Sequence, residues 1–306
     1  MTKVVRVGDV LIGGGNKIAV QSMTNTVTKN ADATSAQINA LTDVGCDIVR
    51  VAVADAADAE ALGDIKKRIK VPLVADIHFD YRLAVAAVRN GADKIRINPG
   101  NIGSDEGLKK IISAAKERGV AIRIGVNGGS LGKDILARFG NTAAALAESA
   151  LEYVRRFEDM GFDNIVLSVK SSDVRKTVDA CRILAKECDY PQHIGVTESG
   201  SGESARVKSA IGIGALLLDG IGDTIRVSLT DNPVEEVLFA KEILRAVGKD
   251  KNYCEVISCP SCGRCGINLI AVAQEIKEYV KDIKKPMKIA VMGCAVNGPG
   301  EAADAD

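Results

Sequence analysis

The chain has 306 residues, of which 46% are hydrophobic, and this is enough for one large domain and a small one around a substantial core. Its 40 Lys and Arg residues balance 40 Asp and Glu residues, so no overall field attracts nucleic acid or an anionic membrane. No apolar run approaches the roughly 20 residues that span a bilayer. The N-terminal segment lacks the apolar core and cleavage site of a secretion signal, which predicts a cytosolic protein.

A short apolar alternation over residues 4–12, followed by glycines at 13–15, predicts a β-hairpin ahead of the main fold. A glycine triplet can hold a phosphate where a helix follows it. No helical pattern follows here, so these glycines are expected to form a plain turn.

From residue 18 onward, short β-rich runs alternate with amphipathic helical stretches, which is the pattern of βα units around a parallel sheet. Eight strands are predicted, over residues 18–23, 47–53, 72–78, 94–99, 121–126, 164–170, 193–199 and 224–229. The last helix is expected over residues 233–247. Eight such units predict an α/β fold, a (β/α)₈ TIM barrel, that occupies residues 1–248.

Four predicted strands carry an arginine between two apolar residues. In a barrel, alternate residues of each strand point inward, and functional groups lie where the strands end. If the apolar neighbours pack under the helices, all four arginines point into the barrel mouth, and these are Arg50, Arg96, Arg123 and Arg226. Other polar residues lie on the same face or just past the strand ends, namely Asp76, His78, Asn98, Asn127, Ser168, Lys170, Thr197, Glu198 and Ser228.

These inward cations outnumber the acids that could neutralise them. A structural salt bridge to a neighbouring strand is expected for one or two arginines, but Asp76 and Glu198 are the only evident inward acids. Because unpaired buried charge is costly, the surplus predicts a site for a multiply charged anion, most simply a diphosphate. His78 is placed to hydrogen-bond a substrate or transfer a proton, whereas His193 starts its strand at the opposite face and is expected to be structural.

Five of the 8 cysteines fall in the last fifth of the chain. The others, Cys46, Cys181 and Cys188, lie in helix or strand patterns and are expected to be buried small hydrophobes. This distribution indicates a reducing compartment and one clustered metal site rather than disulfides. Residues 249–306 predict a small α+β domain with strands at 253–258 and 287–292 and a helix at 267–280.

The cysteine spacing leaves two metals open. Cys259 and Cys262 have the spacing of half a structural zinc site, but no second pair completes it. Cys294 stands alone before a turn rich in Gly and Pro and a carboxylate, which favours an iron–sulfur cluster over zinc. Spacing does not exclude Cys265 as a ligand. Cys254 lies on a predicted strand and is expected to be a packing residue.

The connection between the two domains constrains their arrangement. Barrel helices run antiparallel to their strands, so the last one is expected to lead the chain to the face opposite the mouth. A linker of about five residues spans less than about 20 Å, whereas the barrel is about 30 Å tall. A cluster tethered there could hardly reach its own barrel mouth. The sequence therefore predicts a head-to-tail homodimer in which each small domain caps the partner's barrel.

Seven stretches together resemble one known family. They are residues 21–25 (QSMTN), 75–79 (ADIHF), 96–101 (RINPGN), 125–131 (GVNGGSL), 220–228 (GIGDTIRVS), 259–264 (CPSCGR) and 293–301 (GCAVNGPGE). They are spread over nearly the whole chain, and together they are similar to the 4-hydroxy-3-methylbut-2-enyl diphosphate synthases of the non-mevalonate isoprenoid pathway.

The resemblance implies the two-electron reductive ring opening and dehydroxylation of 2-C-methyl-D-erythritol 2,4-cyclodiphosphate at a [4Fe-4S] cluster. The cluster ligands that it implies are Cys259, Cys262, Cys294 and Glu301. The diphosphate clamp that it implies comprises Arg50, Arg96, Arg123, Asn127 and Lys170. The residues implied around the carbon skeleton are Asp76, His78, Asn98, Glu198, Arg226 and Ser228, with Glu198 as the candidate for proton delivery.

No dinucleotide fingerprint follows a predicted strand, so the electrons are expected from a protein donor such as ferredoxin or flavodoxin. The chain departs from the family pattern at Cys265, where a residue without a thiol is expected. The family also continues beyond this point with a further strand and helix, so the small domain is expected to be incomplete. The alternative function is a non-redox, phosphate-handling barrel, such as a pterin-type transferase, with a structural zinc site.

Overall fold

The computed structural model describes residues 1–102, 104–296, 298, 300 and 302–306. The chain divides into two compact units, Met1–Ile243 and Leu244–Asp306, and each is described by itself. None of the described helices is both long and apolar enough to cross a membrane.

The first unit is built around an eight-stranded parallel sheet with the order β8-β7-β6-β5-β4-β3-β10-β9. Its strands are β3 (Ala19–Met23), β4 (Ile48–Ala52), β5 (Leu73–Ile77), β6 (Lys94–Ile97), β7 (Ala121–Asn127), β8 (Ile165–Lys170), β9 (His193–Ile194) and β10 (Thr224–Ile225). A parallel bridge between Leu167 and Gln192 joins β8 to the residue before β9, so the sheet nearly closes. The predicted (β/α)₈ barrel is therefore confirmed.

Two predicted strands are much shorter than expected. β9 and β10 contain two residues each, whereas residues 193–199 and 224–229 were expected to be extended. Beyond these two strands, isolated hydrogen bonds continue the pairing; for example, the Arg226 N–H donates to the Ile194 carbonyl over 3.1 Å. Gly195 lies in this stretch, and glycine within a strand weakens pairing because it has no side chain to pack.

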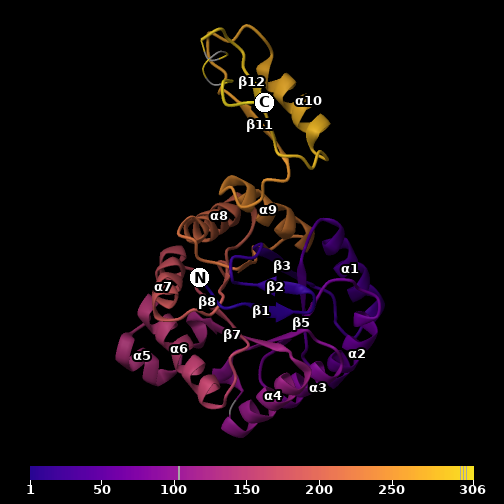
Figure 1. Ribbon diagram of the computed structural model, residues 1–306, viewed down its shortest axis with the longest axis vertical. Coiled ribbons are helices and arrows are strands. Elements are labelled where there is room, and N and C mark those ends of the chain that lie inside the picture. Colours follow the sequence, from indigo (N-terminus) through magenta and orange to yellow (C-terminus); the bar gives the residue numbers. More distant parts are fainter. Residues whose placement is uncertain (103, 297, 299, 301) are drawn as a thin grey trace. The chain divides into compact units, whose positions relative to one another are not determined.

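Helices surround the strands, as Figure 1 shows. They are α1 (Ala31–Asp43), α2 (Ala56–Lys66), α3 (Tyr81–Arg89), α4 (Asp105–Arg118), α5 (Lys133–Phe139), α6 (Ala143–Asp159), α7 (Val174–Glu187), α8 (Gly202–Leu218) and α9 (Pro233–Ala246). Short 3₁₀ turns follow β6 at η1 (Pro99–Asn101) and β7 at η2 (Gly128–Ser130). Several helices begin at a polar side chain that accepts a hydrogen bond from the first turn, which fixes where each helix starts. Examples are Asp55, Ser104, Thr142 and Asp173.

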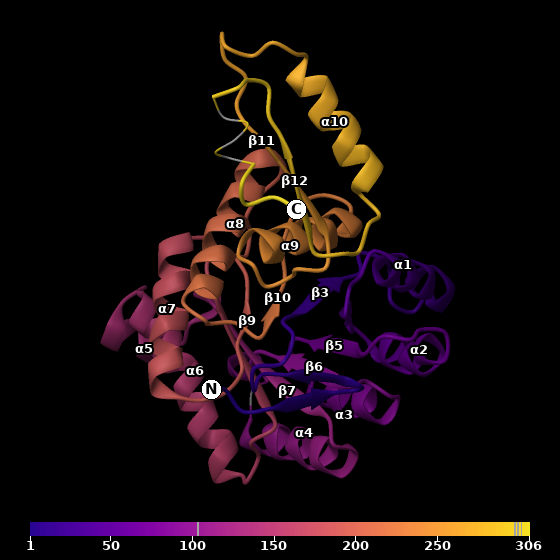
Figure 2. The ribbon, with the colours of Figure 1, turned by 45° about the horizontal axis from the view of Figure 1, so that its top comes forward.

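The N-terminal hairpin closes one end of the barrel (Figure 2). β1 (Val5–Val7) pairs with β2 (Val10–Ile12) in antiparallel fashion, as predicted. Val5, Val7 and Ile12 form one buried cluster with residues from the first half of five barrel strands, Ala19, Ile48, Val74, Ala121 and Val166. The glycines at 13–15 have positive φ angles and form a turn, also as predicted. Because apolar side chains fill this end, the opposite end carries the polar site.

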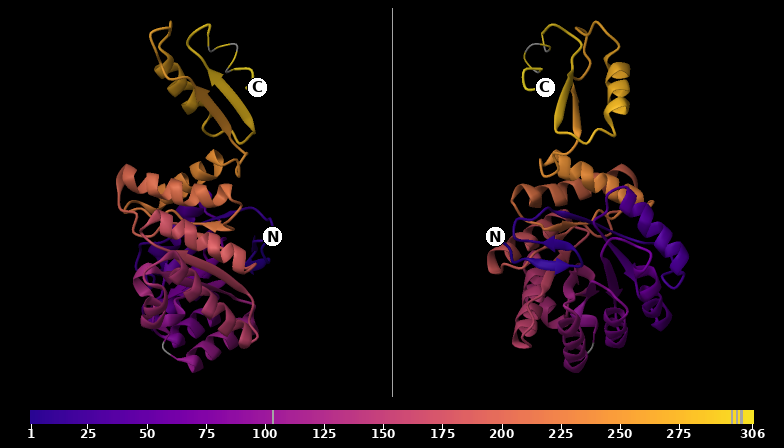
Figure 3. Two further views of the ribbon diagram at one scale, coloured as in Figure 1. Left: turned by 90° about the vertical axis from the view of Figure 1, so that its left-hand side faces the viewer. Right: turned by 45° about the vertical axis from the view of Figure 1, so that its right-hand side comes forward.

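The second unit contains the three elements predicted for it. Strands β11 (Cys254–Ser258) and β12 (Met287–Val291) pair in parallel, and α10 (Leu269–Val280) connects them. Figure 3 shows α10 alongside the two strands. The buried cluster of this unit is small and consists of Leu269, Ala273 and Val291, with partly buried neighbours that include Cys259 and Cys265. The unit division falls within α9, before the predicted boundary at residue 248.

Candidate active site

Four cations line the interior of the barrel on strands β4, β6, β7 and β8. Arg50, Arg96, Arg123 and Lys170 are each no more than 8% exposed. Sheet register places Arg96 between Asp76 on β5 and Arg123 on β7. The strand pattern therefore brought these side chains together as the sequence predicted.

Asp76 holds two of the arginines. Arg96 Nη1 lies 3.1 Å from Asp76 Oδ1, Arg50 Nε lies 3.7 Å from Asp76 Oδ2, and His78 Nε2 lies 3.5 Å from the same oxygen. Burial alone would raise the pKa of Asp76, but Arg50, His78 and Arg96 together hold that pKa well below its usual value. The structural salt bridges expected for one or two arginines are thus those of Arg50 and Arg96.

Arg123 and Lys170 lack an acidic partner among the described residues. Arg123 Nη2 donates to Ser168 Oγ over 2.9 Å, but its buried Nε and Nη1 atoms have no hydrogen-bond partner in the described part of the chain. Burial, followed by repulsion from Arg50 and Arg96, holds the pKa of Arg123 well below its usual value. Burial and then Arg123 do the same to the pKa of Lys170. A bound anion would satisfy these donors and offset their repulsion.

Two glycines make room for these cations, and sequence reasoning missed both. A Cβ at Gly125 on β7 would lie 2.7 Å from Arg96 Nε, and a Cβ at Gly195 after β9 would lie 2.3 Å from the Arg226 carbonyl oxygen and 2.9 Å from Lys170 Nζ. The available signal was a glycine at an inward strand position, which marks a place where another group approaches closely.

Arg226 has a partner that sequence reasoning also missed. Glu236, in the first turn of α9, is 3% exposed and lies 3.2 Å from Arg226 Nη2. Asp76 is buried inside the barrel as expected, but the expectation that Asp76 and Glu198 are the only inward acids was wrong, because Glu236 reaches inward from a helix and Glu198 is exposed. A strand pattern cannot reveal an acid that a helix supplies.

The remaining predicted residues lie at the strand ends. Asn98 is buried and donates from Nδ2 to Ser130 Oγ over 2.8 Å, whereas the His78 side chain is 52% exposed. Asn127 ends β7, and Ser228 is half-buried in the segment after β10. Glu198 has a φ of 53°, which among the described non-glycine residues is the one positive value. Such backbone strain is typical of functional sites.

Below the cations lies a buried polar layer. His193 starts β9, as predicted, and its Nδ1 lies 2.6 Å from Thr224 Oγ1. Lys94 on β6, which sequence reasoning did not single out, is fully buried and donates from Nζ to Gln21 Oε1 over 3.3 Å. Burial, followed by repulsion from Arg123 and Arg50, lowers the pKa of Lys94 to about 7.

The thiols of the second unit lie at the corresponding ends of β11 and β12. Cys259 follows β11 directly, and the Gly266 N–H donates to the Gly293 carbonyl over 3.0 Å, which ties the Cys259–Cys265 loop to the segment that carries Cys294. Hydrogen bonds from the backbone and side chain of Arg264 lower the pKa of the exposed Cys262 thiol.

The described side chains do not enclose a metal site. No group of three or more His, Cys, Asp or Glu residues lies close enough to bind an ion within residues 1–102, 104–296, 298, 300 and 302–306. Glu301, predicted as a ligand, lies outside the described residues. The Cys265 thiol packs against Gly293 and donates to the Ile267 carbonyl over 3.3 Å.

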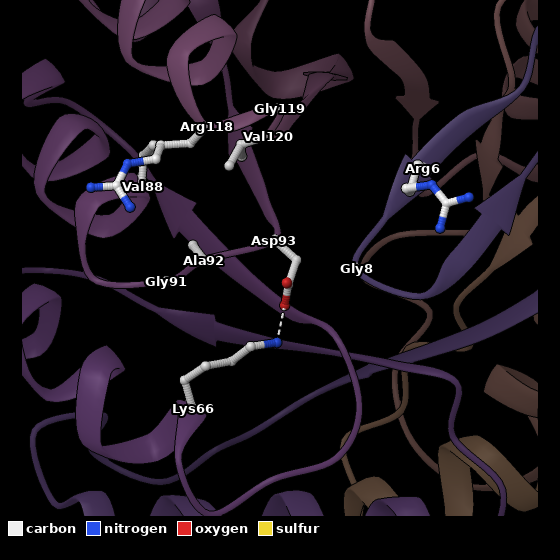
Figure 4. A pocket seen from close by; sticks show the side chains of 10 residues that line it. All are labelled: Arg6, Gly8, Lys66, Val88, Gly91, Ala92, Asp93, Arg118, Gly119 and Val120. Carbon is white, nitrogen blue, oxygen red and sulfur yellow. Dashed lines mark hydrogen bonds and ion pairs between the residues drawn. The ribbon is translucent and has the colours of Figure 1, made fainter.

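A cavity of about 420 Å³ lies elsewhere on the first unit. Its lining includes Gly8 of the hairpin, together with Asp93, which precedes β6, and Val120, which precedes β7. Figure 4 shows Asp93 paired with Lys66. It is therefore at the end of the barrel where the strands begin, where stability rather than chemistry is the usual role.

Fold and site together define a class of protein. A (β/α)₈ barrel with unpaired buried cations toward its mouth is an anion-binding barrel, and a second unit with thiols at two paired strand ends is a candidate soft-metal domain.

Comparisons with known proteins identify the family. Residues 2–241 match the GcpE TIM-barrel domain, and residues 255–306 match the GcpE protein C-terminal domain. The chain therefore belongs to the GcpE family. A relative from Anoxybacillus flavithermus, named 4-hydroxy-3-methylbut-2-en-1-yl diphosphate synthase (flavodoxin), is 56% identical over 100% of this chain and 84% of its own length. A Bacillus subtilis relative with the same name is 53% identical over 100% of this chain and 81% of its own length.

Solved structures add a fold likeness. Dihydropteroate synthase from Stenotrophomonas maltophilia has a TM-score of 0.58 at 14% identity, over 81% of this chain and 98% of its own. The Yersinia pestis dihydropteroate synthase has a TM-score of 0.57 at 12% identity, over 81% of this chain and 99% of its own. At such low identity these structures support the barrel fold alone.

Proposed function

We propose that this chain converts 2-C-methyl-D-erythritol 2,4-cyclodiphosphate to 4-hydroxy-3-methylbut-2-en-1-yl diphosphate, with electrons from flavodoxin or ferredoxin. The observation that carries the proposal is the pair of buried cations, Arg123 and Lys170, that lack an acid among the described residues. The names of the relatives indicate which diphosphate chemistry this anion site serves. A cytoplasmic location fits the thiol content and the protein donor.

The cations are proposed to hold the diphosphate. Arg123 offers Nε and Nη1, and Lys170 offers its ammonium group, so these two supply free donors and uncompensated charge. Arg50 and Arg96 are already oriented by Asp76, and they add directed hydrogen bonds at the cost of little further ordering. Asn127, at the end of β7, completes the proposed clamp.

Residues at the strand ends are proposed to surround the carbon skeleton. Asp76, His78, Asn98, Arg226 and Ser228 form this set. Glu198 is the proposed proton donor, because its carboxyl group is exposed on a strained backbone beside the mouth-forming segments.

The second unit is proposed to hold a [4Fe-4S] cluster through Cys259, Cys262, Cys294 and Glu301. The donor set fits, because three thiols occupy corresponding strand ends and Arg264 favours the thiolate of Cys262. When bound, the cluster would relay, one at a time, the two electrons that ring opening and loss of the hydroxyl group require and that the protein donor provides. Cys265 is proposed to be a packing residue, since its thiol already contacts Gly293 and the Ile267 carbonyl.

A head-to-tail homodimer is proposed as the working form. Seven residues, 247–253, connect α9 to β11, and fully extended they span at most about 25 Å, which is less than the height of about 30 Å of a barrel. Mixed dimers in which one chain carries Arg123→Met and the other Cys294→Ser should regain part of the activity, since one intact mouth can meet one intact cluster domain.

Anaerobic turnover of the cyclic diphosphate with a strong reductant tests the proposed function. The parent protein should be brown, absorb near about 400 nm and form the linear diphosphate, whereas Arg123→Met and Glu301→Ala should be nearly inactive. A colourless, zinc-containing protein that binds a pterin instead would contradict the proposal and support the transferase alternative.

A further inference from the structure

The carboxylate of Glu236 accepts hydrogen bonds from three residues on two segments, β3 and the segment after β10. Ser22 Oγ, on β3, donates to Oε2 over 3.1 Å. Arg226 Nη2, in the segment after β10, lies 3.2 Å from both carboxylate oxygens. The Leu229 N–H donates to Oε1 over 3.0 Å. Glu236 is only 3% exposed, so its carboxylate is largely shielded from competing water.

This arrangement exceeds what a simple ion pair needs. Neutralising Arg226 requires one contact, yet Glu236 also fixes the backbone immediately after Ser228. The next residue is held as well, because the Thr230 N–H donates to the Gly200 carbonyl over 3.0 Å. The segment that carries Ser228 is therefore joined both to α9 and to the loop that carries Glu198.

Arg226 is left with a defined set of free donors. Its Nη2 faces Glu236, while its Nε is buried and has no hydrogen-bond partner among the described residues. Because a guanidinium group is planar and rigid, fixing one edge also fixes the direction of the others. Arg226 thus differs from Arg123, since its charge is compensated while its orientation is set.

We propose that Glu236 is a positioning residue, which orients Arg226 and the Ser228–Leu229 segment toward the cyclic diphosphate. This inference rests on the proposed function, because it assigns Arg226 and Ser228 to that substrate. Glu236 itself is inside the protein and acts through these neighbours. It does not touch the substrate.

The adjacent Glu235 provides a matched control. It occupies the same first turn of α9 but forms a partly exposed ion pair with Arg206, over 3.1 Å. Glu235→Gln therefore makes the same chemical change on the same helical turn without affecting the mouth. A surface pair of this kind contributes little to stability.

The test is steady-state kinetics of the holoenzyme with the cyclic diphosphate, together with thermal unfolding. Glu236→Gln keeps the size of the side chain and an acceptor oxygen but removes the charge that holds Arg226. It should raise KM about 10-fold, with kcat changed less than about threefold, because the lost interaction is in substrate binding. Glu235→Gln should match the parent in KM and kcat.

A double-mutant cycle separates positioning from general stability. With Arg226→Ala present, Glu236→Gln should add less than about twofold to KM, because the two changes act on one interaction. A full, independent effect of Glu236→Gln in that background would overturn the inference. So would a large fall in Tm with KM unchanged.

A milder variant keeps the inference testable if Glu236→Gln folds poorly. Ser22→Ala removes one donor and leaves the bonds to Arg226 and Leu229, so its KM should stay within about twofold of the parent. A rise in the KM of Ser22→Ala of about 10-fold or more over the parent would overturn the inference. Absence of turnover in the parent would instead count against the proposed function, so the two failures are distinguishable.

Discussion

The barrel interior and the thiol unit differ in how much of their order comes from protein contacts alone. In the barrel, Asp76 fixes the buried Arg50 and Arg96, and the buried Glu236 fixes Arg226. The thiol unit has a buried cluster of three residues, and Cys262 is exposed. The barrel side chains are thus ordered by protein contacts, whereas the proposed cluster would contribute much of the stability of the thiol unit.

The largest effect is expected from removing a thiol. Cys294→Ser should lower turnover at least about 1,000-fold and release iron, because the cluster would lose one of its few ligands. Unfolding of residues 244–306, followed by hydrogen exchange, should become easier, while exchange in the barrel strands stays unchanged. Cys254→Ser, on β11, is the control and should keep its iron. An equal loss of hydrogen-exchange protection in both units would contradict the proposed difference between the barrel and the thiol unit.

Removing an unpaired cation should affect binding and stability in opposite directions. Arg123→Met should weaken binding of the cyclic diphosphate about 100-fold or more, since two charge-assisted donors are lost. The free energy of unfolding should stay the same or rise by about 1–3 kcal/mol, because a buried charge without an acid is removed. Calorimetric binding and urea unfolding measure the two quantities. A strongly destabilised variant would show that Arg123 has a structural role.

Filling the space beside Arg96 should have an intermediate effect. In Gly125→Ala the new Cβ would lie 2.7 Å from Arg96 Nε, so the guanidinium group must shift. KM should rise about 10-fold, with destabilisation of about 1–3 kcal/mol. Gly119→Ala tests the effect of a glycine change away from the mouth, because a Cβ added at Gly119 would have no atom within 4 Å. Its positive φ predicts some loss of stability but an unchanged KM.

The smallest effect concerns the pH dependence of stability. Burial lowers the pKa of Lys94 to about 7, against 10.5 in the unfolded chain. Between these values the unfolded chain binds a proton that the folded protein does not, so Lys94 makes stability increase as pH rises and decrease as pH falls toward 7. Lys94→Met should therefore reduce the slope of stability against pH between about 7 and 9.5.

Lys67, which is largely exposed, serves as the control for that measurement. Lys67→Met should leave the slope as it is in the parent. An unchanged slope in Lys94→Met would mean that Lys94 stays protonated in the folded protein across this range.

The features that the sequence revealed share a local origin. The eight strands and the inward arginines follow from apolar and polar residues alternating within one strand, as in Ile95, Arg96 and Ile97. Glu236 was missed because its role depends on how a helix packs over the mouth. Gly125 and Gly195 were missed because their function is the space they leave for atoms of neighbouring segments. The shortness of β9 and β10 was also missed, because it depends on the hydrogen bonds between neighbouring segments, and the residue pattern within one strand does not contain these.

The central claim is that the buried cations of the barrel hold the diphosphate of the substrate. A crystal structure of the protein with the cyclic diphosphate tests it most directly. Phosphate oxygens should lie within about 2.7–3.0 Å of Arg123 and Lys170, with Arg226 still held by Glu236. A diphosphate bound elsewhere, with the Arg123 donors still unpaired, would contradict the account.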